Sequence, residues 1–220
     1  MLYVVATPIG NLSDLTTRAH EILKTVDYIA CEDTRHSGEM LKKIGTNAKL
    51  ISFHVHSWQD RVDHIVSLLL NGSKVALITD AGTPGISDPG AVLVHLAHQH
   101  NITVSPIPGP SAVVAALSVS GFDTDRFRFI GFLPKKKGRQ TMLKEIAQAN
   151  EPVVLFESPH RIAQTLKDFG DILEATRKIC ICREMTKQFE EVLVGSISEL
   201  IGRTIRAQGE FVLVVNAYEK

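Results

Sequence analysis

Ionisable and hydroxyl side chains follow one short apolar segment closely enough to bind a polar ligand or substrate. The segment at residues 27–31 is predicted to be a strand, and the residues after it are Glu32, Asp33, Thr34, Arg35 and His36. Carboxylates there can accept protons or hydrogen bonds, and an arginine can pair with an anion. Capping of the next helix by Asp33 or Thr34 is the competing interpretation, because both residue types favour helix N-caps. The sequence leaves both roles open.

A glycine-rich loop within residues 77–90, LITDAGTPGISDPG, is the second place where a ligand could bind. The run at residues 74–79 is typical of a buried strand in a parallel sheet. Gly82, Gly85 and Gly90 permit positive φ and allow a ligand to approach the backbone closely. The loop is longer than most strand-to-helix connections, which favours ligand binding over a plain connection.

Two helices are predicted to begin at such turns. Asp88 is predicted to cap a helix that has Pro89 at its first position. The turn at residues 107–112, IPGPSA, follows the same pattern, with Gly109 between two prolines and Ser111 as the cap of an apolar helix. This order of strand, turn and helix places backbone donors at the carboxyl edge of a sheet, where open α/β folds bind ligands.

The turn after the first predicted strand argues against an ordinary dinucleotide site. Residues 2–6 form that strand, and TPIGN at residues 7–11 stands where a Rossmann fold would carry G-x-G-x-x-G. The histidines at 95, 98 and 100 lack a carboxylate or cysteine at metal-binding spacing, so they predict a solvated helix face. We therefore expect no metal in the chemistry.

A basic run, PKKKGR at residues 134–139, is the clearest candidate for an anion-binding surface. Arg126 and Arg128 precede it and are expected to reinforce it. A solvated loop is the ordinary interpretation of such a run, and the sequence alone does not decide between the two.

Strands that alternate with helices over the first half predict a parallel α/β domain at residues 1–118. The second half contains more strands and hairpin-like returns, which predicts a mixed α+β domain at residues 119–220. Lys and Arg total 24 and Asp and Glu total 24, so net charge indicates no nucleic-acid partner by itself. The three cysteines show neither a disulfide framework nor zinc spacing. No apolar run approaches the length of a membrane span, so we expect a cytoplasmic protein.

With these motifs assembled, the chain resembles the tetrapyrrole methylase-like S-adenosylmethionine enzymes. Within that family it is most similar to the bacterial branch that methylates the 2′-hydroxyl of a cytidine in the 16S ribosomal RNA of the decoding centre. The matching segments are TPIGNL at 7–12, EDTRHS at 32–37, DAGTPGISDPG at 80–90, PGPSA at 108–112, GFLPKKKGR at 131–139, ESPHRI at 157–162, REMTK at 183–187 and GEFVLVV at 209–215.

The resemblance implies two α/β domains with the methyl donor in the cleft between them, and a homodimer. S-adenosylmethionine would be the cofactor and S-adenosylhomocysteine the product, with main-chain groups providing much of the binding. The donor-binding residues that it implies are Pro8, Asp80, Ala81, Gly82, Gly85, Ile86, Ser87, Pro108, Gly109, Ser111 and Ala112.

The same resemblance implies 16S ribosomal RNA in the small subunit as the partner, with no membrane. The ribose hydroxyl must lose its proton around methyl transfer, and the candidate acceptors are Asp33, Glu32, Glu157 and Glu184, with Asp33 preferred. The candidate RNA-binding residues are Arg35, Lys135, Lys136, Lys137, Arg139 and Arg161.

Two departures from the family pattern leave alternatives open. The family often shows H-x-H-N-E where this chain has His54-Val55-His56-Ser57-Trp58, and members often continue into a small helical segment beyond the position of Lys220. A tetrapyrrole methyltransferase of the same fold is one alternative, and a donor-binding protein that has lost catalysis is the other.

Overall fold

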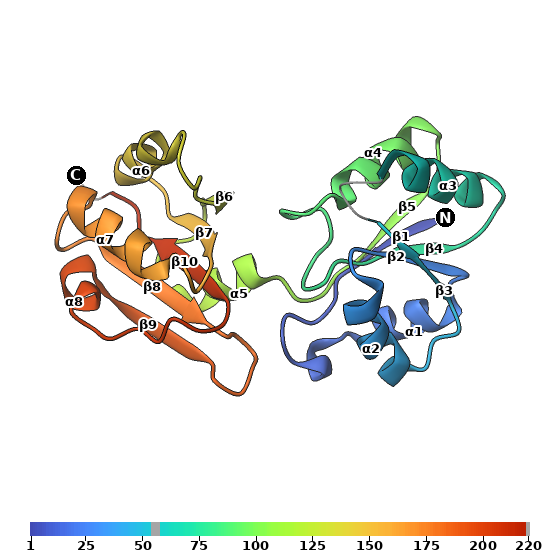
Figure 1. The fold of residues 1–220 in the computed structure, drawn as a ribbon, viewed down its shortest axis with the longest axis horizontal. Coiled ribbons are helices and arrows are strands. Elements are labelled where there is room, and N and C mark those ends of the chain that lie inside the picture. Colours follow the sequence, from blue (N-terminus) through green and yellow to red (C-terminus); the bar gives the residue numbers. More distant parts are fainter. Residues whose placement is uncertain (54–57, 219–220) are drawn as a thin grey trace. The chain divides into compact units, whose positions relative to one another are not determined.

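The computed structural model describes residues 1–53 and 58–218, and of Trp58 and Gln59 it describes the backbone only. The motif at His54–Ser57 therefore lies outside the described residues. The chain divides into two compact units, Met1–Ser111 and Ala112–Lys220 (Figure 1). The sequence places the boundary after residue 118, whereas helix α5 (Ala112–Ser120) packs on strands of the second unit.

The first unit contains a parallel sheet in which five strands are described. The strands are β1 (Leu2–Val5), β2 (Tyr28–Cys31), β3 (Lys49–Ser52), β4 (Val75–Leu77) and β5 (Val104–Ile107), in the order β3-β2-β4-β1-β5. All their pairings are parallel. The central strand β4 is buried at every residue, as expected for a strand covered on both faces. The predicted parallel α/β architecture is confirmed.

Helices cover both faces of this sheet (Figure 1). Helices α1 (Thr17–Thr25) and α2 (Thr34–Ile44) contribute to one buried apolar cluster, and α3 (Trp58–Leu70) and α4 (Gly90–Gln99) contribute to another. A short 3-10 helix, η1 (Leu12–Asp14), precedes α1. Because the strands are parallel, the loops after β1, β2, β4 and β5 all leave the same carboxyl edge of the sheet.

The second unit contains a mixed sheet with five described strands in the order β6-β7-β10-β8-β9. The strands are β6 (Arg128–Phe132), β7 (Val153–Glu157), β8 (Lys178–Arg183), β9 (Glu191–Ser196) and β10 (Phe211–Val215). Strands β6 and β7 are parallel, and the remaining neighbours are antiparallel. The predicted mixed sheet is confirmed.

Helix α5 packs on one face of this sheet, and α6 (Arg139–Ala147), α7 (Ile162–Ile172) and α8 (Ile197–Ile201) pack on the other. The register pairs Phe211 with both Glu157 and Arg183, and Arg183 with Glu191. The ends of β6, β7 and β8 and the starts of β9 and β10 therefore share one sheet edge. The second-half motifs that carry the resemblance begin or end at this edge.

The remaining sequence expectations concern surface and core residues. His95, His98 and His100 are exposed on and just after α4, as predicted. Cys31, Cys180 and Cys182 are free and buried, so they contribute to packing. No helix among the described residues is long and apolar enough to cross a membrane.

Candidate functional site

Four loops at the carboxyl edge of the first sheet are held together by hydrogen bonds. The backbone groups of Thr7 and Gly82 donate to each other's carbonyls at 2.9 and 3.0 Å, which joins the loops after β1 and β4. The Thr83 hydroxyl donates to the Pro110 carbonyl at 3.0 Å, which joins the loops after β4 and β5. These contacts bring the TPIGN, DAGTPG and PGPSA motifs into one assembly.

The loop after β2 is attached to the same assembly. The Thr79 hydroxyl donates to the Glu32 carboxylate, and the Asp33 N–H donates to the Asp80 carboxylate at 3.4 Å. Thr79 and Thr83 are missing from the sequence-based candidates. Their hydroxyl side chains, directly after a buried strand, are the signal that could have found them. Thus Glu32, Asp33 and Asp80 lie in one cluster within the first unit.

Asp88 closes the glycine-rich loop and also makes the predicted side-chain contact with the start of helix α4. Helix α4 begins at Gly90 with Pro89 in the N-cap position, so the helix starts one residue later than predicted. The Asp88 carboxylate accepts from the N–H groups of Gly85 at 2.9 Å and Gly90 at 2.7 Å. A Cβ at Gly90 would lie 2.7 Å from Asp88 Oδ1, so this turn requires glycine.

Asp33 caps helix α2, which is one of the two roles that the sequence left open. Its Oδ1 accepts from the Arg35 N–H at 2.8 Å and the His36 N–H at 3.4 Å, and its Oδ2 lies 3.4 Å from the Arg35 guanidinium. Hydrogen bonds from the Arg35 backbone and side chain hold the pKa of the Asp33 carboxyl below its usual value. The side chain is still 36% exposed, and that of Arg35 is 93% exposed. Both can therefore reach a ligand.

The residues at this edge carry groups suited to the methyl donor that the resemblance implies. Asp80 is exposed and offers a carboxylate to an ammonium group, and Ala81, Ile86 and Ser87 are also exposed. Gly82, Gly85 and Ser87 have φ of 83°, 87° and 67°, which turns the backbone sharply. The N–H groups of Gly82 and Gly85 already bond to Thr7 and Asp88, so these two glycines shape the loop.

The second turn that the resemblance assigns to donor binding is shaped by close backbone packing. A Cβ at Gly109 would lie 3.0 Å from the Ala6 Cβ, so glycine lets this turn approach the loop after β1. Pro108 and Gly109 are exposed, whereas Pro8, Ser111 and Ala112 are half-buried. Ala112 begins α5 and is the single donor-site candidate that belongs to the second unit. The other candidates lie on loops at the carboxyl edge of the first sheet.

Glu157 is a buried anchor in the second unit. Its side chain has no exposed surface, and it accepts from the Thr165 hydroxyl at 2.6 Å and the Ser158 N–H at 2.8 Å. The Arg161 Nε lies 3.5 Å from the same carboxylate. Burial without an opening to solvent suits a positioning role better than direct contact with a substrate.

Arg139 and Arg161 hold the start of the basic loop in place. Arg139 forms an ion pair with Asp168 at 2.7 Å, and these two side chains are 12% and 11% exposed. Arg161 donates to the Leu133 carbonyl at 2.6 Å. Lys135, Lys136 and Lys137 are exposed and supply the loop's accessible charge. 

Arg126 and Arg128 do not reinforce this charge, contrary to the sequence-based expectation. Arg126 precedes β6 and Arg128 is its first residue, whereas the lysines follow the strand, so its five residues separate the two groups by about 17 Å. Arg128 also forms an ion pair with Glu151 at 3.1 Å. The accessible charge of the basic loop therefore comes from the three lysines.

Glu184 holds two loops together at the same edge. Its Oε1 accepts from the Glu210 N–H and from the Lys187 ammonium, both at 3.0 Å, and Lys187 also reaches the Glu210 carboxylate at 2.8 Å. Burial opposes ionisation of Glu184, but these hydrogen bonds outweigh it and lower its pKa. A Cβ at Gly209 would lie 2.4 Å from the Glu184 side chain. The close approach of these loops thus requires Gly209.

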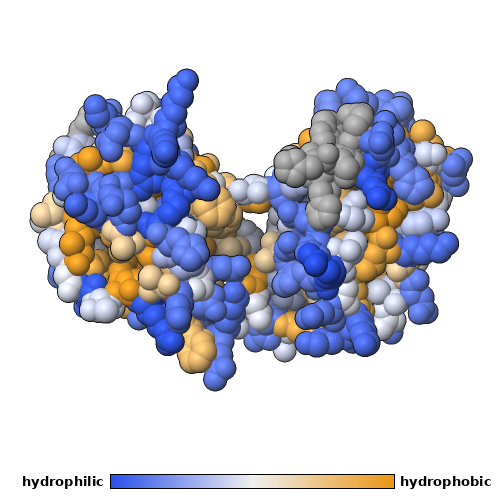
Figure 2. Space-filling view, viewed as in Figure 1, coloured by the Kyte–Doolittle hydropathy of each residue, from blue (hydrophilic) through white to orange (hydrophobic). Residues whose placement is uncertain are grey.

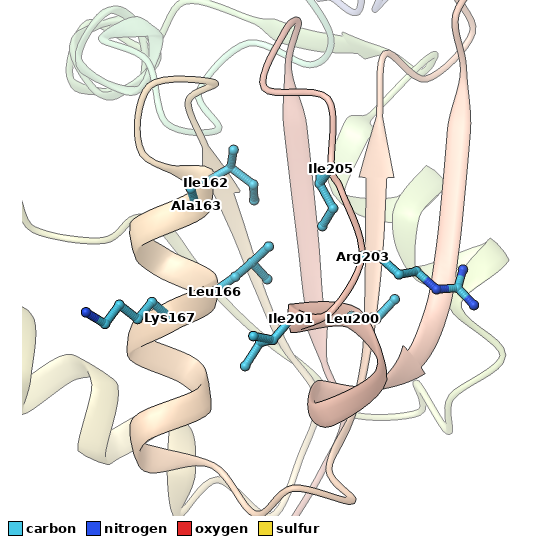
Figure 3. Close-up of a pocket in the computed structure, with 8 residues that line it drawn as sticks. All are labelled: Ile162, Ala163, Leu166, Lys167, Leu200, Ile201, Arg203 and Ile205. Atoms are coloured by element: carbon cyan, nitrogen blue, oxygen red, sulfur yellow. The ribbon is translucent and has the colours of Figure 1, made fainter.

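A pocket of about 160 Å³ lies on the helical face of the second unit, between α7 and α8 (Figure 3). Apolar side chains point into it, whereas Lys167 and Arg203 extend away from it. The space-filling view shows hydrophobic side chains gathered over these two helices (Figure 2). None of the sequence-based site residues lines this pocket, although Ile162, the last residue of the ESPHRI motif, does. Among the described residues, no group of three or more His, Cys, Asp or Glu could hold a metal ion.

The fold and the loop assembly define a class, a two-unit α/β protein with loops joined at the carboxyl edge of its parallel sheet, which is where open α/β folds bind ligands. The sequence profile described as Tetrapyrrole (Corrin/Porphyrin) Methylases matches residues 1–201. The chain belongs to this family of methyltransferases. The family implies S-adenosylmethionine as the methyl donor.

Relatives and solved structures agree with this assignment. Proteins named "Ribosomal RNA small subunit methyltransferase I" from Vibrio cholerae and Escherichia coli O157:H7 are 45% and 42% identical over 99% of this chain, covering 77% and 78% of their own lengths. The structure of the methyltransferase CobJ matches with TM-score 0.73 at 17% identity, over 98% of this chain and 93% of that one. Uroporphyrin-III-C-methyltransferase from Thermus thermophilus matches with TM-score 0.68 at 17% identity, over the same shares of the two chains.

Proposed function

We propose that this protein transfers a methyl group from S-adenosylmethionine to the 2′-hydroxyl of a cytidine in the 16S ribosomal RNA of the small subunit. The observation that carries the proposal is the identity of 42–45% with small-subunit ribosomal RNA methyltransferases over nearly the whole chain. The solved tetrapyrrole enzymes share the fold at only 17% identity, so they support the architecture and not the substrate.

The donor is proposed to bind at the loop assembly of the first unit. S-adenosylmethionine supplies an electrophilic methyl group when it is bound. Asp80 is suited to its ammonium group, and the turns around Gly82, Gly85 and Gly109 admit it close to the backbone. In-line displacement depends strongly on positioning, which the hydrogen bonds among the four loops provide.

Asp33, with Glu32 beside it, is proposed to orient the ribose hydroxyl and to receive its proton. Asp33 is partly exposed and remains ionised because its pKa is lowered. Glu32 is fixed by Thr79 at the end of β4. Glu157 and Glu184 are assigned positioning roles, because one is fully buried and the other is engaged with Lys187 and the Glu210 N–H.

RNA phosphates are proposed to contact the three exposed lysines of the basic loop and Arg35. Arg139 and Arg161 set the shape of that loop through Asp168 and the Leu133 carbonyl. We further propose that the protein acts as a homodimer in the cytoplasm, where its ribosomal substrate is assembled. Light scattering of the purified protein tests the dimer.

The decisive experiment incubates the protein with labelled donor and small ribosomal subunits from cells that lack this methylation. Mapping should locate label on one cytidine ribose of the 16S RNA. Label on a base would support methylation of RNA by this protein but would refute the assignment to the 2′-hydroxyl. Donor binding without transfer to RNA would refute the proposal, and a parallel reaction with a porphyrin precursor would then test the tetrapyrrole alternative.

A further inference from the structure

An exposed aromatic ring and an arginine lie together on the β8–β9 side of the second sheet. Phe189 is 57% exposed in the turn between β8 and β9, and the Arg206 guanidinium carbon lies 5.9 Å from its ring centroid. Single exposed aromatics are common on protein surfaces, so exposure alone indicates no function. The contact with Arg206 is the first feature that distinguishes Phe189.

The backbone around this pair is held in an unusual conformation. Glu184 and Thr186 are not glycines, yet their φ values are 50° and 66°. Such conformations persist where surrounding contacts impose them. Glu184 and Lys187 supply those contacts by joining this turn to Glu210, on the segment that also carries Arg206. Phe189 and Arg206 are therefore presented by two loops fixed to each other.

The pair shares a sheet edge with the basic loop. Lys135, Lys136 and Lys137 follow β6, Phe189 precedes β9, and these are the two outer strands of the sheet. Four strand spacings separate them, which amounts to about 19 Å. Three nearby carboxylates are paired with cations, Glu184 and Glu210 with Lys187 and Glu191 with Arg183, and the Glu190 carboxylate accepts from the Thr186 N–H. A polyanion along this edge thus meets lysines at one end and an aromatic ring with one arginine, Arg206, at the other.

We propose that Phe189 and Arg206 form a stacking platform for an unpaired base of the RNA substrate. This inference rests on the proposed function and adds a contact to a base, whereas the basic loop recognises phosphates. Unpaired RNA bases stack on aromatic rings and arginine planes, which a paired duplex does not allow. The substrate class is therefore RNA with an accessible single-stranded segment.

The test compares two labelled RNAs of about 12 nucleotides, a size that lies within single-strand binding sites. One carries all its bases, and the other has abasic riboses in its central segment. Binding is measured by fluorescence anisotropy with the wild type and with Phe189→Ala, Phe189→Trp and Arg206→Ala. Phe127→Ala is the matched control, because Phe127 is 43% exposed and lies at the opposite end of β6.

The wild type should bind the complete RNA about 5- to 150-fold more tightly than the abasic RNA. Phe189→Ala should remove this difference in affinity without changing the salt dependence of RNA binding. Arg206→Ala should make the difference in affinity smaller. Phe189→Trp and Phe127→Ala should keep the difference. The platform is refuted if the wild type binds the two RNAs equally tightly. It is also refuted if Phe189→Ala still prefers the complete RNA, or if it loses the same factor in affinity for both RNAs.

Methyl transfer to small subunits is measured separately to distinguish this inference from the proposed function. Base-dependent binding without methyl transfer would refute the function and leave the platform standing. Methyl transfer by a wild type that lacks base-dependent binding would support the function and refute the platform.

Discussion

Substitution of Asp33 separates helix capping from a role in methyl transfer. The Asp33 Oδ1 accepts from the N–H groups of Arg35 and His36. Asn offers the same Oδ1 and caps helices about as well as Asp, whereas Ala has no acceptor. Asp33→Asn should therefore keep helix α2 intact. Asp33→Ala should cost about 1 kcal/mol, which lowers the melting temperature by about 4 °C for a unit of this size.

Methyl-transfer activity should depend on the carboxylate of Asp33 and not on the stability of helix α2. If Asp33 orients the ribose hydroxyl and takes its proton, both variants should lose about 100-fold or more in methyl transfer while donor binding is unchanged. Circular dichroism measures unfolding, calorimetry measures donor affinity, and labelled donor with unmethylated small subunits measures transfer. A fully active Asp33→Asn variant would refute the role in transfer and leave Asp33 as a helix cap.

The pH dependence supplies a second test of the same residue. Hydrogen bonds from Arg35 lower the pKa of Asp33, so the carboxylate is ionised from mildly acidic pH upward. Its protonation should therefore reduce transfer only as the pH falls below the ordinary range of an aspartate. A loss of activity near neutral pH that disappears in Asp33→Asn would contradict this assignment.

Three further substitutions test other parts of the structure. Replacing Lys135–Lys137 with Gln should lower the slope of RNA affinity against salt by about 2, since each phosphate contact to a single strand contributes about 0.7; an unchanged slope would indicate a solvated loop. Glu184→Gln should destabilise the second unit near neutral pH. Because the folded-state pKa of Glu184 is lowered, the wild type should be more stable than the variant above the unfolded-state pKa, and this difference in stability should disappear as pH falls through the folded-state pKa. Unfolding curves measured at several acidic pH values test this. A difference in stability that does not depend on pH would exclude the ion pair as its source. Gly82→Ala should strain the backbone, because residue 82 has a φ of 83° and the added Cβ would lie 3.4 Å from Ile9. Calorimetry should therefore show weaker donor binding, and unaltered affinity would mean that the loop tolerates the change.

Sequence patterns predicted the two architectures because they depend on local periodicity and turn residues. Apolar runs such as β4, bounded by turns, identify strands buried on both faces, and their alternation with helices implies parallel pairing. The boundary between the units was harder to place. Helix α5 is apolar and follows a first-unit turn, and only its contacts show that it packs on the second sheet.

The pairing of charged side chains could not be read from the sequence, because it depends on residues far apart in the chain. Arg139 lies within a run of exposed cations, yet its partner Asp168 comes from α7. Glu157 has a suitable position at a strand end, but burial by Thr165 and Arg161 removes it from solvent. The sequence placed Asp88 correctly near a helix start. Its second role, accepting a hydrogen bond from the Gly85 N–H, depends on the backbone conformation of the loop.

These pairings narrow the four candidate carboxylates and agree with the sequence-based preference for Asp33. Glu157 and Glu184 are engaged by donors from their own unit, which leaves Asp33 and Glu32 as the carboxylates tied to the donor loops. A carboxylate of lowered pKa is a weak base, so transfer of the hydroxyl proton to Asp33 is expected to follow methyl transfer, which makes that proton more acidic. Asn keeps the position of the side chain but not the charge that accepts this proton, so Asp33→Asn should lose transfer while helix α2 stays capped. The Asp33 N–H donates to the Asp80 carboxylate, so the loop that carries Asp33 is linked directly to the glycine-rich loop that we propose binds the donor.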